Sequence, residues 1–388
     1  MKYKKRVLIY DDEIRGHHLE YIHHLHEGAT QNKEIDFIFA IPNTINDKEN
    51  KLVWEKSDNI KYHLLSDSEI NLTGNSIVNS FKRSRIARKI AIEYNVNEIF
   101  FNVLIGLLPA ATFVIPKNIK ISSIIYMIYL YRWKRSSFII KLFDSIKYIL
   151  LSRRGNFNNV FILNDKSAPV FLNRKFKTSK FLYLPDPFMP IGEIGLINIR
   201  EKYKILSDNI IYLHFGSMAE SKGTLEILNA LIQLRREDLI GRTFIFAGRV
   251  GDNIKDMFYE KYHMLKDKVQ IIVFDEFCEY SFLGSLCLSF DYILLPYKRT
   301  SQSSGVIGYG AQFNKPVVVP NKGLLGKLVR KYNLGYLIES SSTKHIIEFI
   351  RDNKAINKFN SNKKFRQDYI REHNVSHFIN LIFSKLIS

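Results

Sequence analysis

Residues 209–224 read NIIYLHFGSMAESKGT, and this stretch decides the fold. The apolar and aromatic run from Asn209 to Phe215 is typical of a buried strand, and a polar loop containing Gly216 and Gly223 follows it. Apolar residues at helical spacing then continue from Thr224 to Arg236. Because a strand, a short loop and a helix form the first part of a βαβ unit, a parallel sheet is expected here.

The same alternation extends over the rest of the chain. Further strands are predicted at residues 6–10, 36–41, 60–64, 98–103, 122–129, 159–163, 243–247, 269–274, 292–295 and 316–319. Helical patterns at residues 17–29, 77–94 and 136–151 lie between several of them. Strands that alternate with helices predict an α/β protein with mostly parallel sheets.

A proline-rich stretch, LPDPFMP from Leu184 to Pro190, interrupts this pattern. Its three prolines are excluded from helix interiors and central strands. We therefore predict an N-terminal domain over residues 1–184, a hinge over 185–190 and a C-terminal domain over 191–364. Residues 365–388 are predicted to form a C-terminal helix, broken near Asn374, that packs back on the N-terminal domain. Two βαβ domains joined by a hinge place a cleft between them, where ligands often bind.

The charge of the chain is strongly positive: 57 Lys and Arg against 38 Asp and Glu give a net charge of +19 over 388 residues. Nucleic acid, an anionic membrane or a phosphate-bearing substrate would each suit such a protein. An AT-rich coding sequence, which favours Lys, Ile and Asn, explains the excess equally well. Two cysteines, Cys278 and Cys287, exclude a disulfide scaffold and a Cys-based zinc site, and they fit a reducing compartment.

The first residues carry no targeting signal that we recognise, because the apolar run Val7–Tyr10 is too short for a signal-peptide core. The apolar stretch 99–115 contains Asn102, Gly106 and Pro109, and a buried strand followed by a helix explains it better than a membrane span. We therefore expect a cytoplasmic protein, with peripheral attachment to a membrane as an open alternative.

Two loops could bind an anion. In the loop 214–223, Lys222 can reach back over the start of a helix, and a helix N-terminus with a lysine forms an anion site. The loop 295–306 combines Lys298 and Arg299 with small residues at a helix start, a combination that suits a diphosphate. The small residues are Ser301, Ser303, Ser304 and Gly305. The alternative for both loops is an ordinary turn with solvated basic residues.

The order and spacing of these motifs resemble the second domain of the retaining nucleotide-sugar glycosyltransferases of the GT-B fold, the group 1 or family 4-like enzymes. The resemblance covers residues 209–337 and extends to the N-terminal domain mainly through topology. The matching stretches are Phe215-Gly216, Lys222-Gly223, Ala247-Gly248, Val273-Phe274, Phe290-Asp291 before Pro296, Ser303–Val306, Lys315–Val318, Asn321–Gly323 and Leu334-Gly335.

The resemblance implies two Rossmann-like domains that face each other across a cleft, with the donor bound to the second. It implies that Lys222, in a loop with Gly216 and Ser217, binds the donor diphosphate and stabilises the leaving group. It implies that the backbone of Ser303, Ser304 and Gly305 holds the distal phosphate. Glu276 and Phe277 would line the nucleobase pocket. The nucleotide sugar is a substrate, so no cofactor and no metal are expected.

Two departures from the family pattern concern charged residues. Ser217 stands where the family has an arginine, and Ser301 and Tyr309 stand where it has a pair of glutamates that contact the sugar and the ribose. Arg249 or Arg299 could replace the missing phosphate ligand. In the same way, Gln302 or Ser301 could contact the sugar.

The N-terminal candidate site is the loop 11–20, DDEIRGHHLE. In GT-B enzymes the loop after the first strand faces the cleft, and in several inverting members a Gly-His pair there supplies the general base, which resembles Gly16-His17. A histidine suits that task because its pKa lies near neutrality. His17 is therefore the predicted base of an inverting reaction, and Gly16 and His18 are placed on the acceptor side. The alternative is that His17 and His18 are surface residues at a helix start. The other three histidines of the same helix, His23, His24 and His26, are expected to be solvated.

Basic residues gather at two places in the N-terminal domain. The first group is Lys82, Arg83, Arg85, Arg88 and Lys89, and the second runs from Arg132 to Arg154 among Phe, Ile and Tyr. The second resembles an amphipathic membrane-surface element. The alternative is a core-facing helix with a solvated basic face.

The predicted function is that of a glycosyltransferase, a hexosyltransferase with a retaining mechanism. It would move a sugar from a nucleotide-sugar donor to a glycan or a lipid-linked saccharide, in the synthesis of a bacterial surface polysaccharide. Three alternatives stay open: a catalytically silent relative that partners such enzymes, a nucleotide-sugar epimerase and a nucleic-acid-binding protein. The last is the weakest, because no recognised nucleic-acid motif occurs in the sequence.

Overall fold

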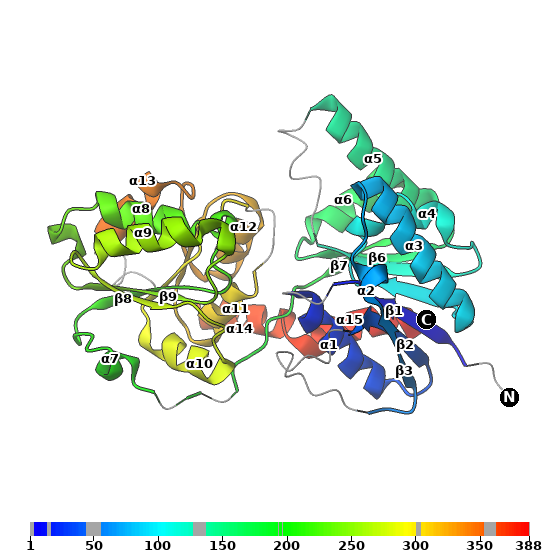
Figure 1. The fold of residues 1–388 in the computed structure, drawn as a ribbon, viewed down its shortest axis with the longest axis horizontal. Helices are drawn as coiled ribbons and strands as arrows, with labels where there is room; N and C mark the ends of the chain where they lie inside the picture. The colour runs from blue at the N-terminus through cyan, green and yellow to red at the C-terminus, as the bar shows by residue number, and fades with distance from the viewer. Residues whose placement is uncertain are drawn as a thin grey trace. The chain divides into compact units, whose positions relative to one another are not determined.

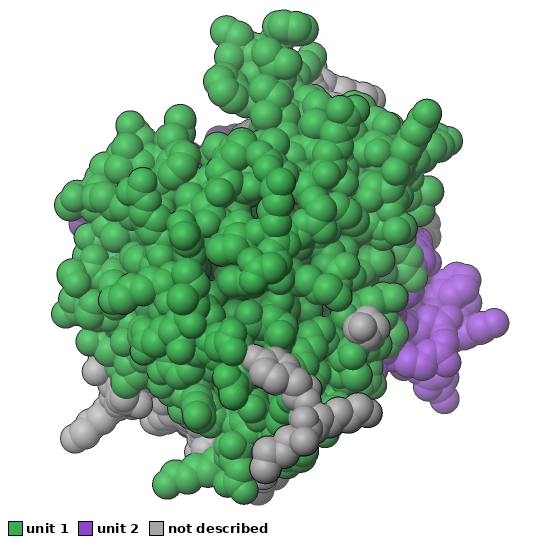
Figure 2. Space-filling model, turned by 90° about the vertical axis from the view of Figure 1, so that its right-hand side faces the viewer, with its two compact units in different colours: residues 1–185, 375–388 green, residues 186–374 purple. Residues whose placement is uncertain are grey.

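Strands and helices alternate along the protein, as the sequence predicts (Figure 1). The computed structural model describes residues 4–13, 17–43, 56–126, 137–192, 194–195, 197–299, 304–352 and 362–387. The chain divides into two units, one of residues 1–185 and 375–388 and the other of residues 186–374 (Figure 2). Each unit is built on one parallel sheet, which confirms the predicted α/β class.

The first unit contains a seven-stranded sheet in the order β3-β2-β1-β4-β5-β6-β7. Its strands are β1 Arg6–Tyr10, β2 Asp36–Pro42, β3 Ile60–Leu65, β4 Glu98–Phe101, β5 Lys120–Ile125, β6 Phe157–Leu163 and β7 Phe181–Leu184. Central strands such as β4 are buried along their whole length. This explains why they read as apolar runs rather than as alternating patterns.

Helices cover both faces of this sheet. They are α1 His17–Gln31, α2 Asp67–Ile70, α3 Ser76–Glu93, α4 Ala111–Val114, α5 Phe138–Arg153, α6 Ser167–Phe176 and α15 Val375–Ile387. One core lies under α3 to α6, and a second lies under α1 and α15, which lie side by side (Figure 1). Packing against α15 buries His24 beside Phe378, and Tyr62 covers His26. The expectation that these two histidines are solvated is therefore wrong.

The second unit contains a six-stranded sheet in the order β10-β9-β8-β11-β12-β13. Its strands are β8 Ile210–Phe215, β9 Arg242–Ala247, β10 Gln270–Phe274, β11 Tyr292–Leu294, β12 Val317–Pro320 and β13 Gly335–Ile338. Its helices are α7 Ile199–Lys202, α8 Thr224–Gln233, α9 Lys255–Leu265, α10 Tyr280–Ser289, α11 Val306–Gln312, α12 Gly323–Tyr332, α13 Thr343–Arg351 and α14 Lys363–Glu372. The predicted C-terminal segment 365–388 thus contributes α14 to this unit and α15 to the first.

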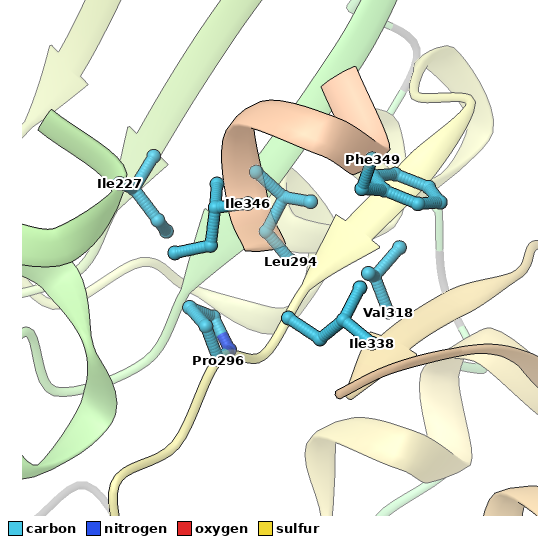
Figure 3. Close-up of a pocket in the computed structure, with 7 residues that line it drawn as sticks. All are labelled: Ile227, Leu294, Pro296, Val318, Ile338, Ile346 and Phe349. Atoms are coloured by element: carbon cyan, nitrogen blue, oxygen red, sulfur yellow. The ribbon is translucent and has the colours of Figure 1, made fainter. Parts of the chain in front are cut away.

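The two faces of the second sheet bury separate cores, one under α8, α9 and α13 and the other under α10, α11, α12 and α14. A cavity of about 10 Å³ lies in the first core, between β11, β12, β13, α8 and α13 (Figure 3). Its lining is apolar: Ile227, Leu294, Pro296, Val318, Ile338, Ile346 and Phe349. A gap this small and without polar partners does not hold water or a substrate, so it is a packing defect.

No described helix is both long and apolar enough to span a membrane.

Candidate functional site

In the second unit, the strand order reverses between β8 and β11. The strands β9 and β10 lie on one side of this pair, and β12 and β13 lie on the other. In open parallel sheets, ligands bind outside the carboxyl ends of the strands at such a reversal. The loops that follow β8 and β11 are the two loops that the sequence predicts to bind an anion.

Glycines bring the loops after β8 and β9 together. Gly216 and Gly248 have φ angles of +98° and +133°, which favour glycine, and a Cβ atom on Gly248 would overlap the main-chain oxygen of Gly216. The Gly216 N–H donates to the oxygen of Ala247 over 2.9 Å. The Met218 N–H donates to the oxygen of Arg249 over 3.0 Å, so the Arg249 backbone runs beside the loop that leads to Lys222.

The loops after β8 and β11 also pack directly on each other. The Lys298 N–H donates to the main-chain oxygen of Ser221 over 3.0 Å. Gly223 has a φ of +75°, and a Cβ atom there would overlap the oxygen of Pro296. This close backbone contact therefore requires glycine at position 223, directly after Lys222.

A buried histidine lies beneath both loops. His214 Nδ1 lies 2.8 Å from the oxygen of Leu294, and Nε2 lies 2.9 Å from the Thr224 hydroxyl. A carbonyl can only accept, so Nδ1 carries the proton and Nε2 accepts from Thr224. Burial lowers the pKa of His214 to about 4, so the ring is neutral at pH 7. One side chain thus links the ends of β8 and β11 to the first residue of α8.

The two lysines of the site differ in their partners. The Lys222 ammonium lies 4.0 Å from the ring centroid of Tyr297, and it forms no ion pair with any residue that the structure describes. Lys298 Nζ lies 2.7 Å from a Glu226 oxygen and 3.2 Å from a Glu220 oxygen, and the hydrogen bond to Glu226 chiefly raises the pKa of Lys298. Within the part of the chain that the structure describes, the charge of Lys222 therefore has no counter-ion that a ligand would have to displace, whereas that of Lys298 is balanced by two carboxylates.

The other predicted diphosphate ligands have different surroundings. The side chains of Ser217, Arg249 and Arg299 are exposed. Ser304 is buried, its hydroxyl lies 3.2 Å from the Tyr297 hydroxyl, and Gly305 precedes the first turn of α11. Their contacts with a donor stay predictions. The remaining predicted ligands, Ser301, Gln302 and Ser303, lie outside the described residues.

The predicted nucleoside-binding residues lie on two elements. Glu276 and Phe277 are exposed after β10, in a loop anchored by Asp275, which accepts from the Val250 N–H over 2.7 Å. Tyr309 lies in α11, and its ring packs in the core beside Phe188 and Phe215. The role of Tyr309 in ribose binding stays a prediction, and its ring already has a packing role.

The first unit has a polar cluster at the corresponding place, where the strand order reverses between β1 and β4. Asp11, directly after β1, is buried, and its two carboxylate oxygens lie 3.0 and 2.9 Å from His18 Nδ1. The Asn102 amide, directly after β4, donates to Asp11 over 2.6 Å. The Tyr126 hydroxyl donates to Asn102 over 3.2 Å, and the Tyr126 ring stacks on His18.

Burial and charge act in opposite directions on this pair. Burial raises the pKa of Asp11, although the bonds from His18 and Asn102 oppose the rise. Burial alone would lower the pKa of His18, but the hydrogen bond and charge of Asp11 outweigh it and leave that pKa above its ordinary value. The His18 side chain stays 28% exposed, so part of it can meet a ligand.

The predicted base, His17, begins α1, but its side chain lies outside what the structure describes, as does Gly16. Its neighbour His18 is described, and the structure pairs it with the carboxylate of Asp11. Sequence reasoning placed Asp11 and Tyr297 in candidate loops without giving either residue a role, and it missed Asn102 as a site residue. Two signals were available: Asp11 directly follows the predicted strand 6–10, and Asn102 is a polar residue inside the apolar stretch 99–115.

Among the described residues, no group of three or more His, Cys, Asp or Glu side chains could hold a metal ion.

The sequence matches no protein-family model and no curated protein. Solved structures, however, match over the whole length of the chain. A glycosyltransferase from Rickettsia africae has a TM-score of 0.67 and 15% identity, with 100% of this chain and 99% of that one covered. HepE from Anabaena, in complex with UDP-glucose, has a TM-score of 0.67 and 14% identity, with 98% and 99% covered. WaaG, a glycosyltransferase involved in lipopolysaccharide biosynthesis, has a TM-score of 0.64 and 14% identity, with the same coverage. The chain therefore has the two-domain α/β fold of the GT-B glycosyltransferases.

Proposed function

We propose that this protein is a glycosyltransferase that moves a sugar from a nucleotide-sugar donor to a glycan or lipid-linked saccharide. The observation that carries the proposal is the ammonium of Lys222, which has no counter-ion among the described residues and lies where the second sheet reverses its strand order. Structures of the same fold hold UDP and UDP-glucose, which supports a nucleotide-sugar donor.

The chemistry needs positive charge at the leaving group. In the transfer, the anomeric carbon–oxygen bond breaks and the electron pair stays on the diphosphate, while an acceptor oxygen bonds to the carbon. A fixed ammonium near the diphosphate stabilises the growing negative charge. Lys222 is suited to this role, and the further candidates are Arg249 and Arg299, which are both exposed and lie in loops that bond to the loop of Lys222.

The proton of the acceptor hydroxyl needs a destination. In a retaining reaction, which the motifs of the second domain favour, the leaving phosphate oxygen accepts it. In an inverting reaction we propose His18 as the base. With Asp11 ionised, the Nδ1–H of His18 donates to it, so Nε2 presents its lone pair and can accept the acceptor proton.

The experiment is a thermal-shift screen with UDP, GDP, ADP and their hexose conjugates, followed by calorimetry on each hit. A ligand that binds only the folded protein raises the unfolding midpoint. The substitution Lys222→Ala should abolish the shift, whereas Lys266→Ala, an exposed lysine at the end of α9, should leave it unchanged. The donor-site assignment fails if no nucleotide shifts the wild-type midpoint.

Turnover separates this proposal from its rivals. A catalytically silent partner would bind a nucleotide sugar without hydrolysing or transferring it. An epimerase would convert or release the sugar without an acceptor. A nucleic-acid-binding protein would bind oligonucleotides in a strongly salt-dependent way, and nucleotide sugars would not compete.

For the acceptor side, we propose that α5 attaches the protein to the cytoplasmic face of an anionic membrane, where a lipid-linked acceptor would be found. The buried face of α5 consists of Asp144, Tyr148, Leu151 and Ser152. Its exposed apolar side chains are Phe138, Ile139, Ile140, Leu142, Phe143, Ile146 and Ile149. A helix whose outer face is more apolar than its inner face needs a partner.

The charge of α5 favours a lipid partner. Its only acidic residue, Asp144, is buried, whereas Arg153 is exposed and Lys141 and Lys147 are partly exposed. The segment 132–135, which belongs to the same predicted element, lies outside the described residues. A separate observation concerns the product. WaaG, a structural neighbour of this protein, is involved in lipopolysaccharide biosynthesis, which supports a surface polysaccharide as the product here.

A further inference from the structure

Tyr297, in the loop after β11, contacts the side chains of two predicted diphosphate ligands: Lys222, and Ser304, whose backbone is predicted to hold the distal phosphate. Its ring lies 4.0 Å from the Lys222 ammonium, and its hydroxyl lies 3.2 Å from the Ser304 hydroxyl. Only 3% of Tyr297 is exposed. We propose that Tyr297 is a positioning residue of the donor site, which holds Lys222 and Ser304 at the places where they meet the diphosphate. This inference rests on the proposed donor-binding function.

An aromatic ring can hold a lysine without neutralising it. The negative face of the ring attracts the ammonium, but the ring has no net charge that competes with a phosphate. Lys298, held by Glu220 and Glu226, shows the contrasting arrangement in the same loop. A free lysine would lose rotamer entropy when it binds a ligand, and the ring reduces that loss because it orders the side chain beforehand.

The backbone fixes the ring in place. The Tyr297 N–H donates to the main-chain oxygen of Leu295 over 2.8 Å, in a tight turn centred on Pro296. Pro296 in turn contacts the loop of Lys222 through Gly223. The ring therefore belongs to the same rigid junction that joins the two loops.

The phenol acts on the second ligand. The Tyr297 hydroxyl can donate to Ser304 Oγ, which leaves the Ser304 hydroxyl hydrogen for a phosphate oxygen. Ser304 is buried, so this bond also fixes its rotamer. One tyrosine thereby sets the separation between an ammonium donor and a hydroxyl donor, which a diphosphate must bridge.

Two substitutions separate the two contacts, measured by calorimetry with the nucleoside diphosphate that gives the largest thermal shift among UDP, GDP and ADP. Tyr297→Leu removes both contacts and should weaken binding of the diphosphate by about tenfold. Tyr297→Phe keeps the ring and should weaken it only about threefold. Binding of the corresponding nucleoside without phosphates should not change. Because Tyr297→Leu removes the support of Lys222, a following Lys222→Ala substitution should cost less than it does in the wild type.

Tyr332→Phe provides the control. It removes the hydroxyl of another buried tyrosine, whose partner is Glu372 rather than a residue of the loops after β8 and β11. Equal losses for the nucleoside and its diphosphate, or additive effects of the Tyr297 and Lys222 substitutions, would overturn the inference. Should Tyr297→Leu not fold, the cycle of Tyr297→Phe with Ser304→Ala decides: additive losses overturn the assignment. If the folded wild type binds none of the nucleotides, the proposed function itself fails, which is a different outcome.

Discussion

Gly248 approaches Gly216 so closely that a side chain on Gly248 would overlap the main-chain oxygen of Gly216. This contact joins the loop after β9, which carries Arg249, to the loop that leads to Lys222. The arrangement of the candidate phosphate ligands therefore depends on a backbone contact that only glycine permits.

The substitution Gly248→Ala should disturb this contact. The φ of +133° strains any other residue, and the added methyl group must displace the backbone, so we expect a loss of at least about 1 kcal/mol in unfolding free energy. Nucleotide binding should weaken with it. Urea unfolding and calorimetry measure the two effects. Gly192→Ala, where a Cβ meets open space, is the control, and equal behaviour of both variants would contradict the prediction.

The two lysines of the site should differ in their effect on nucleotide binding. Lys222→Ala removes a charge that has no ion-pair partner among the described residues, so the Kd of the nucleoside diphosphate should rise by about tenfold or more. Lys298→Ala removes a charge that Glu226 already balances, and the Kd should change less than about threefold. Calorimetry on both variants gives the comparison. Equal losses would show that Lys298 leaves its carboxylates to bind the ligand.

Acid should destabilise the second unit through His214. Burial lowers the pKa of His214 to about 4, below its ordinary value of about 6.5. Between these two values the unfolded chain binds a proton that the folded chain does not. Stability present above about pH 6.5 is therefore lost as the pH falls toward 4, by roughly 3 kcal/mol.

Urea unfolding at pH 7 and at pH 4.5 should show this loss. The variant His214→Gln should be less stable than the wild type at pH 7, but its stability should depend less on acid. An unchanged acid sensitivity would exclude His214 as the cause.

The opposite sign is expected for His18. Its pKa is raised, so its pairing with Asp11 contributes stability below the ordinary histidine pKa and loses it as the pH rises through the folded value. Burial, the largest influence, lowers this pKa, and Asp11→Asn removes the two strongest effects that raise it, the hydrogen bond and the charge of Asp11. Titration of the His18 ring by NMR should therefore give a pKa below that of the wild type. Asp12→Asn, which removes a weaker charge effect, should lower it less; a shift as large as that of Asp11→Asn would contradict the pairing.

The sequence predicts most of the strands because buried parallel strands are apolar along their whole length. It does not predict β7 and β13, which have four residues each. β13 begins with Gly335, where a Cβ would overlap the backbone of Val317, and a glycine at a strand start reads as a turn. The α/β class thus follows from local patterns, while β13 depends on a contact between two residues that are distant in the sequence.

The candidate site could be predicted only in part, for a similar reason. Lys222 and Gly223 stand out because they adjoin a strand, a loop and a helix in one stretch of sequence. The contact of Lys222 with Tyr297 joins residues 75 positions apart, and the bond of Asp11 to Asn102 depends on β1 and β4 being neighbours. The choice between His17 and His18 depends on the orientation of the first turn of α1, which the pair His-His cannot specify.

The exposed apolar face of α5 should bind anionic vesicles. Leu142 and Phe143 are 50% and 60% exposed, and burying their exposed parts in a bilayer contributes roughly 2 kcal/mol or more. Co-sedimentation should show binding to vesicles that contain phosphatidylglycerol, with weaker binding to pure phosphatidylcholine and at high salt, because the basic residues of α5 attract the anionic lipid.

The double substitution Leu142→Ser with Phe143→Ser should reduce vesicle binding by about tenfold or more, since each serine removes the apolar surface that inserts. Ile240→Ser is the control, because Ile240 is 72% exposed but lies in the second unit, outside α5. Two results would contradict the membrane assignment. One is equal binding of the two variants to the vesicles. The other is a wild type that dimerises without lipid and loses this dimer in the α5 variant, which would identify the face as a contact between two copies of the chain.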